Sequence, residues 1–293
     1  MLGPTASGKS EVALALAERL EAEILSVDSM QVYRGMDIGT AKPGPPDRSR
    51  VPHHMIDVAD PEDEYTVAEF QRDAREALAA SRRPVIVVGG SGLHFRAVVD
   101  PLEFPPHDPS IRRHLDHLEP AEAKARLLAA DPGAGALVDV DNPRRVARAL
   151  EVLELTGRRP SQRSNDPARR RVASYEPEIP FQAIGLDPGP ALAERASLRL
   201  DAMRRAGLLE EVASLAGRLG RTASQAVGYR QLLPVVAGEL DPDAGFRGAA
   251  RATIRLARRQ RTFFRRDPRI RWLAWDDDPS ILVERAGAAL EAA

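Results

Sequence analysis

The first residues of the chain carry a pattern that can bind phosphate. They match the spacing G-x-x-x-x-G-K-S of the phosphate-binding loop. Glycines let successive backbone amides turn toward phosphate oxygens, and the following helix adds the positive end of its dipole. Lys9 can supply a charge to the terminal phosphate, and the Ser10 hydroxyl can ligate Mg²⁺. We therefore predict a phosphate site, rather than a chance glycine-rich turn, at Gly3, Pro4, Thr5, Ala6, Ser7, Gly8, Lys9 and Ser10.

The surroundings of this loop favour a phosphate site. Residues 11–20 form an amphipathic pattern typical of the helix that follows such a loop. Three of the 42 lysines and arginines are lysines, and one of the three is Lys9, where the loop needs it. Only Met1 and Leu2 precede the loop, where a buried strand is expected. We expect either a first strand that is cut short or a true start that lies upstream.

A carboxylate follows the next apolar segment. Residues 22–27 predict a short strand, and Asp28 comes directly after it. Ligands of open α/β sheets gather at the carboxyl ends of strands, so Asp28 is expected beside the phosphate loop. The apolar run 84–88 predicts a central parallel strand, and it ends in a glycine-rich turn at 89–93. A typical P-loop NTPase has a metal-binding Asp at such a strand end, so this turn argues against an ordinary ATPase.

The most basic part of the chain is 251–266. It contains seven arginines, two phenylalanines and no acidic residue. A solvated helix face usually mixes charges of both signs, so arginines alone favour phosphate or nucleic acid over a bland surface helix. The formal net charge of the whole chain is −1, so this argument is a local one.

Composition limits the class of protein. At 293 residues with 43% hydrophobic content, the chain suits one large or two modest domains. The absence of cysteine excludes disulfides and cysteine-ligated zinc, and it fits a reducing compartment. No apolar run reaches the ~18 residues of a membrane span, and the first residues do not resemble a signal peptide. We expect a soluble, cytoplasmic monomer.

A change in pattern predicts two domains. Alternating strands and helices in 1–103 and 179–293 predict an α/β fold, with a P-loop NTPase-like parallel sheet flanked by helices. Residues 104–178 predict a helical insertion domain. Its histidines could be imagined as metal ligands, but a solvated helix face is the better interpretation. The helical patterns of the insertion cover 110–118, 120–130 and 142–155.

Seven stretches, in this order, resemble the tRNA dimethylallyltransferases, also called tRNA isopentenyltransferases. The resemblance covers nearly the whole chain, and the second stretch is far more specific than the phosphate loop alone. The stretches are GPTASGKS at 3–10, DSMQVYRGMDIGTAKP at 28–43, HHMID at 53–57, GGSGL at 89–93, NPRRVARALEV at 142–152, VGYRQ at 227–231 and RRQRTFFR at 258–265.

The resemblance implies an enzyme that transfers a dimethylallyl group from its diphosphate to N6 of the adenosine on the 3′ side of the tRNA anticodon. It implies that the phosphate loop, with Mg²⁺ at Ser10, binds the departing diphosphate, although the loop alone suggests nucleotide or ATP binding. Asp28 matches the catalytic aspartate that takes the proton of the amine. Thr5 and Lys9 are the other implied catalytic residues.

The resemblance also implies contacts with tRNA. The adenosine must leave its stack to reach the pocket, which Asp28, Ser29, Met30, Gln31 and Ser91 are expected to line. The remaining implied tRNA contacts are Arg144, Arg145, Val146, Ala147, Arg148, Gln225, Ala226, Val227, Gly228, Tyr229, Arg230, Arg258, Arg259, Gln260, Arg261, Thr262, Phe263, Phe264 and Arg265.

The chain departs from the family pattern at three positions. Ser91 stands where a Thr is frequent, and His94 replaces a frequent aromatic residue. Ala213 follows a Glu-Val pair after which the family often has a basic residue. Either the diphosphate is bound more weakly here or another arginine substitutes.

Two other functions fit part of the pattern. A small-molecule or nucleotide kinase shares the phosphate loop and the strand-end Asp, but it does not need an arginine-rich helix. A nucleic-acid-binding NTPase without prenyl chemistry would use the loop and the arginines together.

Overall fold

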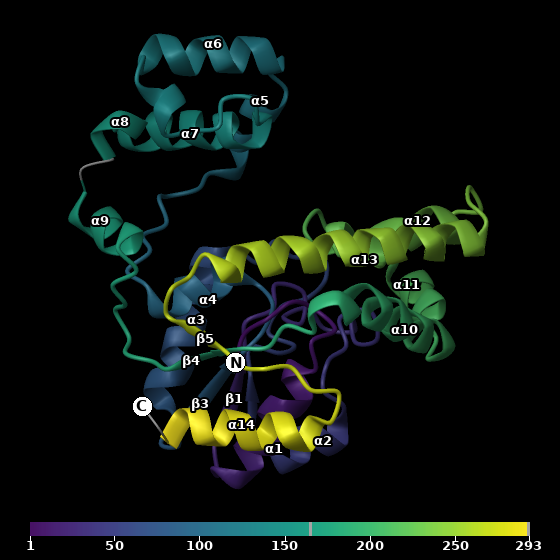
Figure 1. Ribbon diagram of the computed structural model, residues 1–293. Coiled ribbons are helices and arrows are strands. Elements are labelled where there is room, and N and C mark those ends of the chain that lie inside the picture. Colours follow the sequence, from purple (N-terminus) through teal and green to yellow (C-terminus); the bar gives the residue numbers. More distant parts are fainter. Residues whose placement is uncertain (164–165, 292–293) are drawn as a thin grey trace. The chain divides into compact units, whose positions relative to one another are not determined.

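The computed structural model describes residues 1–163 and 166–291. The chain forms two compact units (Figure 1): Met1–Val99 with Ile179–Ala293, and Asp100–Glu178. The chain leaves the first unit at residue 99, whereas the sequence placed this boundary at 103, and it returns at residue 179. Among the described residues, no helix combines the length and the apolar character needed to cross a membrane.

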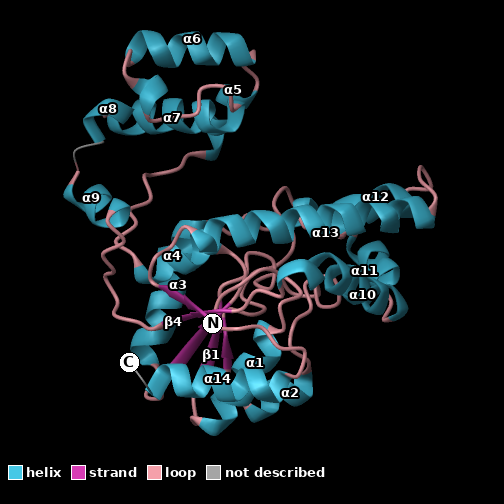
Figure 2. Ribbon diagram, in the orientation of Figure 1, coloured by secondary structure: helices cyan, strands magenta, loops and turns pink. Residues whose placement is uncertain are grey.

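The first unit is built on parallel strands (Figure 2). Three of them form a sheet in the order β2-β1-β3, and two more pair as β4-β5. Leu2 makes single parallel bridges to Gly89 beyond β3 and to Gly185 in β4, so the segment before the phosphate loop lies between these strands. The strands are β1 Glu23–Ser26, β2 His53–His54, β3 Val85–Val88, β4 Ala183–Gly185 and β5 Ile270–Trp272.

The segment 53–58 contains only a very short strand. Only His53–His54 pair with β1. Met55 and Asp57 have positive φ angles of 62° and 57°, which an extended strand cannot accommodate. Asp57 is bound in this turn by Lys42 and Arg48, each at 2.6 Å. These ion pairs stabilise the turn that follows β2.

Helices cover both faces of the β1–β3 sheet. Ile24 packs in one apolar cluster with Leu16 of α1 and Leu282 of α14, whereas its neighbour Leu25 packs in another with Phe70 and Phe264. This alternation is the two-residue period of a strand buried on both sides. The helices of this unit are α1 Lys9–Arg19, α2 Pro45–Arg50, α3 Val67–Ala80, α4 Gly92–Val99, α10 Leu192–Arg205, α11 Leu208–Leu215, α12 Tyr229–Val236, α13 Pro242–Arg265 and α14 Pro279–Glu291.

Helix α3 begins with two reciprocal hydrogen bonds between Thr66 and Glu69. The Thr66 hydroxyl accepts a hydrogen bond from the Glu69 amide at 3.2 Å, and the Glu69 carboxylate accepts one from the Thr66 amide at 2.7 Å. This reciprocal pair is a capping box. Phe70 and Ala74, which follow on one side of the helix, are fully buried.

The second unit contains helices and no strand among its described residues. Its core joins Leu115, Leu127, Val146 and Leu150 from three helices. His107 is bound to the buried Glu151 at 2.5 Å, and the described residues contain no group of three acidic or histidine side chains that could hold a metal ion. The helices are α5 Pro109–Asp116, α6 Pro120–Ala130, α7 Pro143–Thr156, α8 Pro160–Arg163 and α9 Pro167–Ala173.

Candidate active site

The phosphate loop folds tightly around the start of α1. Gly8 precedes the helix with φ at 80°, a left-handed conformation that glycine adopts without strain. Lys9 is buried, and its ammonium group donates a hydrogen bond of 3.1 Å to the carbonyl of Pro4. Burial, together with the nearby charge of Arg199, lowers the pKa of Lys9 to about 8. The loop therefore keeps a cation in a poorly hydrated position, where an anion would be bound strongly.

Two hydroxyl groups of the loop differ in their surroundings. Ser7 is completely buried, and its hydroxyl has no hydrogen-bond partner in the described structure. Such a group is a donor available to a bound oxygen. Ser10 is exposed in the first turn of α1. A Mg²⁺ ion here would be held by the Ser10 hydroxyl, phosphate oxygens and water, which is the usual coordination of Mg²⁺ at phosphate sites.

Asp28 is fixed at the end of β1 beside the loop. One of its carboxylate oxygens accepts hydrogen bonds from the amides of Met30 at 2.9 Å and Gln31 at 3.3 Å. Asp28, Thr5, Met30 and Gln260 line one hollow. The structure therefore brings together Asp28 and Thr5, as expected. Ser29, Gln31 and Ser91 are not among the residues that line this hollow.

Helix α10 brings two arginines that the sequence did not single out. Arg199 lines the same hollow as Asp28, and burial lowers the pKa of its guanidinium while the charge of Asp28 opposes that shift. The Arg195 guanidinium donates to the carbonyl of Ala6 at 3.1 Å. Arg195 and Arg199 are four residues apart and therefore share one side of the helix. That spacing is the signal that could have identified them.

Ala213 does not lie in this hollow. It is exposed on α11, and a different arginine, Arg199, stands among the residues around Asp28. Ala213 therefore supplies no side chain to this hollow, and Arg199 is a cation that lines it.

Ser91 is oriented by His94. Its hydroxyl lies 2.7 Å from Nδ1 of His94, whose ring packs edge-on against Phe70 at 4.6 Å. Burial lowers the pKa of His94 to about 4, so this ring is neutral at neutral pH. The histidine that replaces the frequent aromatic residue therefore keeps the apolar packing and adds a partner for the serine.

The long polar segment after Asp28, residues 29–43, is fixed by hydrogen bonds to a carboxylate of the protein itself. Glu211 of α11 accepts hydrogen bonds from the amides of Asp37 at 2.9 Å, Ile38 at 2.7 Å and Gly39 at 3.0 Å. The Tyr229 hydroxyl donates to the same carboxylate at 2.5 Å. A Cβ atom on Gly39 would lie 2.4 Å from the Tyr229 ring, so only glycine fits there. Much of this specific stretch thus serves to fix the loop.

The side chain of Gln31 also makes hydrogen bonds within the protein. Its side-chain oxygen is bonded to the Ser26 hydroxyl at 2.8 Å, and its amide nitrogen donates to the carbonyls of Thr40 at 3.1 Å and Ala41 at 3.3 Å. These bonds occupy the side chain that was predicted to contact tRNA. We therefore interpret Gln31 as a residue that closes the loop.

The expected contact segment 225–230 is only partly accessible. Tyr229 is 0% exposed, so the prediction that its side chain contacts tRNA is wrong. Ala226 is buried as well, but together with Val227 and Gly228 it lines the hollow around Asp28. The hydrophobic packing of α12 against α11 and α13 removes this aromatic ring from the surface. Gln225 and Arg230 remain exposed.

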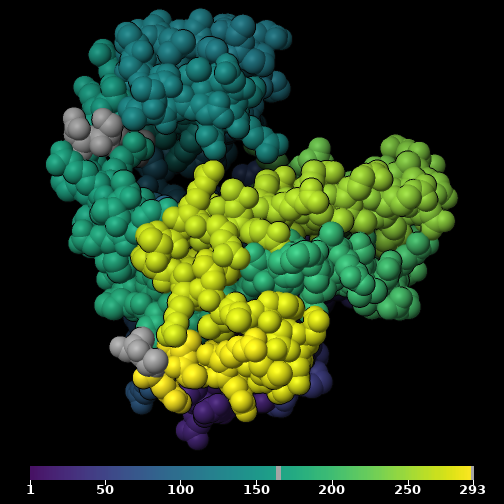
Figure 3. Space-filling view, viewed as in Figure 1, coloured from purple at the N-terminus to yellow at the C-terminus, as the bar shows by residue number. Residues whose placement is uncertain are grey.

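The arginine run lies on helix α13, part of whose surface is visible in Figure 3. The sequence predicted that this run lacks acidic partners, and for two of its members that is wrong. Asp187, which follows β4, accepts from Arg261 at 2.7 Å and from Arg265 at 3.0 Å. Phe264 is fully buried, so it too cannot contact RNA. Arg265 is exposed despite its ion pair. The other exposed arginines of the run are Arg251, Arg255, Arg258, Arg259 and Arg266.

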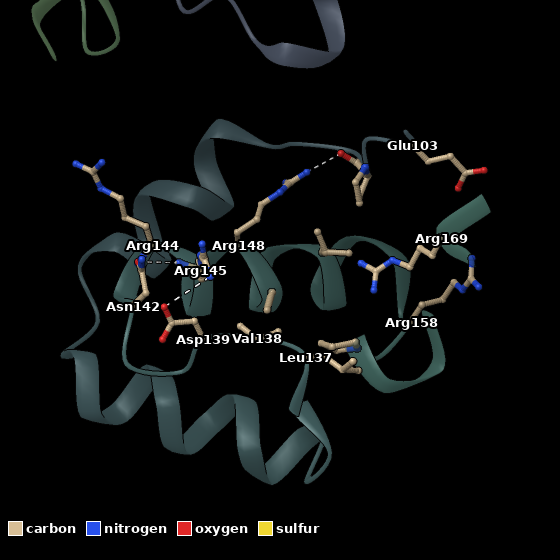
Figure 4. A pocket seen from close by; sticks show the side chains of 14 residues that line it. Glu103, Leu137, Val138, Asp139, Asn142, Arg144, Arg145, Arg148, Arg158 and Arg169 are labelled. Carbon is tan, nitrogen blue, oxygen red and sulfur yellow. Dashed lines mark hydrogen bonds and ion pairs between the residues drawn. The ribbon is translucent and has the colours of Figure 1, made fainter. Parts of the chain in front are cut away.

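The tRNA-contact residues expected in the insertion unit also divide into buried or internally bonded residues and exposed ones. Val146 and Ala147 are buried in its core. Arg148 donates to the carbonyls of Pro105 at 2.7 Å and Pro106 at 3.0 Å and to Glu151 at 2.8 Å, so its guanidinium is used internally. Arg144 and Arg145 are exposed at the start of α7 (Figure 4).

Comparison with known proteins decides the family. A family model described as IPP transferase matches residues 31–267, and one described as isopentenyl transferase matches residues 1–51. The chain belongs to the IPP transferase family. The chain is 48% identical over 285 residues to the tRNA dimethylallyltransferase of Streptomyces coelicolor, covering 94% of this chain and 89% of that protein. The protein of the same name from Streptomyces avermitilis is 46% identical with the same coverage.

A solved structure agrees with this assignment. The tRNA isopentenylpyrophosphate transferase of Bacillus halodurans is 32% identical to this chain, with a TM-score of 0.69, and the match covers 99% of this chain and 95% of that one. The predicted α/β, P-loop NTPase-like fold is thereby confirmed. The predicted family is confirmed as well.

Proposed function

We propose that this enzyme transfers a dimethylallyl group from dimethylallyl diphosphate to N6 of the adenosine 3′ to the anticodon in tRNA and releases diphosphate. The observation that carries this proposal is the position of Asp28 in one hollow with Arg199 and Thr5, beside the buried Lys9 of the phosphate loop. A carboxylate and two cations at one place suit a reaction that removes a proton from one partner while an anion leaves the other.

The phosphate loop would bind the leaving group. When the bond between the allylic carbon and the diphosphate oxygen breaks, negative charge grows on the diphosphate. Lys9 and Arg199 can neutralise that charge, and the Thr5 hydroxyl at the edge of the hollow can donate to the departing oxygen. Mg²⁺ held through Ser10 would supply further charge neutralisation to the diphosphate.

Asp28 would prepare the acceptor amine. Two backbone amides hold one of its carboxylate oxygens, which leaves the other oxygen able to accept a proton from N6. The nitrogen then forms its bond to the allylic carbon, and its proton passes to Asp28. Apolar side chains of Leu200, Met203 and Leu256 also line the hollow and would exclude water from the allyl group.

The exposed arginines would hold the tRNA. On α13 these include Arg258 and Arg259, and on the insertion unit they include Arg144 and Arg145. One arginine side chain can bind two phosphate oxygens at once. Such contacts strengthen binding of RNA but do not depend on its base sequence. We place the enzyme in the cytoplasm because its proposed acceptor is tRNA. We propose a monomer because one chain supplies every group named for the reaction.

The test is to incubate the protein with dimethylallyl diphosphate, Mg²⁺ and bulk tRNA, digest the RNA and search for prenylated adenosine by mass. The expected result is a product that requires both substrates. A parallel reaction with ATP in place of the donor serves as the control for a kinase. Turnover of ATP without prenylated adenosine would overturn the proposal.

A further inference from the structure

Trp275 lies against the phosphate loop and comes from a segment that the proposed chemistry does not use. It belongs to residues 273–278, which join β5 to α14. A Cβ atom on Gly8 would lie 3.8 Å from the Trp275 ring and 3.8 Å from the guanidinium of Arg195. Both side chains therefore reach the same point of the loop backbone, just before α1 begins.

Arg195 stacks on the ring of Trp275. Its guanidinium carbon lies 4.9 Å from the ring centroid. Within about 6 Å the face of an aromatic ring attracts a guanidinium, and the indole is the strongest aromatic partner in this contact. The indole nitrogen of Trp275 is buried and has no hydrogen-bond partner in the described part of the chain. The ring therefore acts through its face rather than through its polar group.

The segment that carries Trp275 is fixed on both sides of the ring. Arg285 of α14 donates a hydrogen bond of 2.7 Å to the carbonyl of Ala274, and it pairs with Asp276 at 3.2 Å. Trp275 also packs against the apolar cluster that contains Leu16 of α1. A ring held in this way restricts the conformations of the long, flexible arginine that stacks on it.

Arg195 in turn binds the phosphate loop at a strained residue. Its Nε donates a hydrogen bond of 3.1 Å to the carbonyl of Ala6. Ala6 has a φ angle of 63°, a left-handed conformation that is unfavourable for alanine and persists only where its surroundings stabilise it. The C=O and N–H of a trans peptide point in opposite directions, so this bond also directs the amide of Ser7 into the loop, where it lies 3.3 Å from the carbonyl of Pro4. An inward amide is the group that a phosphate oxygen binds.

Asp277 offers Arg195 an alternative partner. Its carboxylate lies 3.6 Å from the guanidinium, and its side chain is 85% exposed. An ion pair at this distance and exposure is weak, so it does not by itself determine where the arginine lies. Without the aromatic face, Arg195 would be free to turn from the Ala6 carbonyl toward this carboxylate.

We propose that Trp275 is a positioning residue for the diphosphate site: by stacking on Arg195 it holds the guanidinium on the Ala6 carbonyl and keeps the phosphate loop in its binding conformation. The proposal rests on the proposed role of the loop in binding the diphosphate of the donor. It adds a residue that the sequence pattern did not identify, and Arg195 is the group through which that residue acts.

The test measures binding of inorganic diphosphate, with Mg²⁺, to the whole protein by titration calorimetry. Trp275→Leu is expected to weaken binding about three- to fivefold, because leucine fills space but offers no aromatic face. Trp275→Phe retains a face and should bind within about twofold of wild type. Trp272→Leu is the matched control, because Trp272 stacks on a different arginine, Arg265, at 4.2 Å.

A double-variant cycle separates positioning from a merely structural role. Arg195→Ala should weaken binding at least as much as Trp275→Leu, and the two substitutions together should weaken it no further than Arg195→Ala alone, because the ring acts only through the arginine. Asp277→Asn should strengthen binding more in the Trp275→Leu protein than in wild type, because it removes the carboxylate that competes for the released arginine. A ring that only supports the fold would give additive effects and no such rescue.

The inference is overturned if Trp275→Leu binds diphosphate like wild type, if the effects of Trp275→Leu and Arg195→Ala add, or if Trp272→Leu weakens binding equally. Thermal melting identifies a variant that does not fold. Trp275→Met, a second variant without an aromatic face, replaces Trp275→Leu in that case.

Transfer assays distinguish this inference from the proposed function. In Trp275→Leu the KM for dimethylallyl diphosphate should rise about as much as the Kd for diphosphate, with kcat within about twofold of wild type. If wild type binds diphosphate but forms no prenylated adenosine, the proposed function fails, while the calorimetry still decides the role of Trp275. If wild type is active and Trp275→Leu has an unchanged KM and Kd, the role of Trp275 alone fails.

Discussion

The amide of Thr5 donates a hydrogen bond of 2.8 Å to the side-chain oxygen of Gln260. This bond joins the phosphate loop to the arginine-rich helix α13 across 255 residues of sequence. Gln260 was predicted to contact tRNA, but its oxygen instead determines the position of a loop amide. The proposed sites for diphosphate and for tRNA are therefore connected through one side chain.

Replacing Gln260 should affect the donor. In Gln260→Ala the Thr5 amide loses its acceptor, so the KM for dimethylallyl diphosphate should rise about five- to tenfold, the effect of ~1–1.4 kcal/mol for one hydrogen bond. Gln260→Glu retains an acceptor but adds a negative charge beside the diphosphate, so its KM should rise further. Steady-state kinetics with varied donor measure both, and the exposed Gln225→Ala is the control. An unchanged donor KM in both variants would contradict the positioning of the loop by Gln260.

Asp28→Asn should impair the chemical step. The amide retains the shape of the side chain but cannot take the proton of N6, so kcat should fall by about 10²- to 10⁴-fold. The affinity for tRNA should change little, because a single neutral replacement leaves the arginines in place. Asp63→Asn, at an exposed position, is the matched control. Loss of tRNA binding with normal kcat would assign Asp28 to binding instead.

Binding of diphosphate should depend on the charge of Lys9. Burial lowers the pKa of Lys9 to about 8, so the free enzyme loses this positive charge as the pH rises through 8. The ratio of the wild-type affinity for inorganic diphosphate to that of Lys9→Met should therefore be largest below pH 8 and fall as the pH rises above 8. Titration calorimetry from pH 6.5 to 9.5, about 1.5 units on either side of that pKa, measures this ratio. A ratio that is constant over this range would show that Lys9 does not act through its charge.

The bond network around Glu211 should control the stability of the loop at 37–39. Glu211→Ala leaves three backbone amides without their acceptor, so the free energy of unfolding should fall by about 2–4 kcal/mol. Tyr229→Phe removes only one donor and should cost about 1 kcal/mol. Denaturant unfolding measures both, and amide hydrogen exchange at residues 37–39 should accelerate in Glu211→Ala. Equal effects of the two substitutions would contradict the assigned roles.

Arginines of α13 should separate into two classes. Arg258→Ala with Arg259→Ala should weaken tRNA binding and lower its salt dependence, because both residues are exposed. Arg261→Ala with Arg265→Ala should mainly lower stability, because both pair with the buried Asp187. Binding at several salt concentrations and thermal unfolding distinguish the classes. The same salt slope for both double variants would remove the distinction.

Local patterns in the sequence determined the phosphate loop, the capping box of α3, the helices of the insertion and the family. Each depends on residues close together in the chain, where spacing alone specifies backbone geometry and helix periodicity. The place of Asp28 beside the loop also followed from the sequence, because a strand end at a parallel sheet edge is a predictable position.

Only the tertiary structure decided which polar side chains are available. Arg199 reaches the hollow of Asp28 from a distant helix, Asp187 neutralises two arginines that looked unpaired, and Glu211 binds the loop that looked free to bind substrate. A carboxylate can pair with any cation that folding brings within about 4 Å, whatever their separation in the chain. Pairing across such separations leaves no periodic trace in the sequence, so the charges available to diphosphate and RNA become visible only in the folded chain.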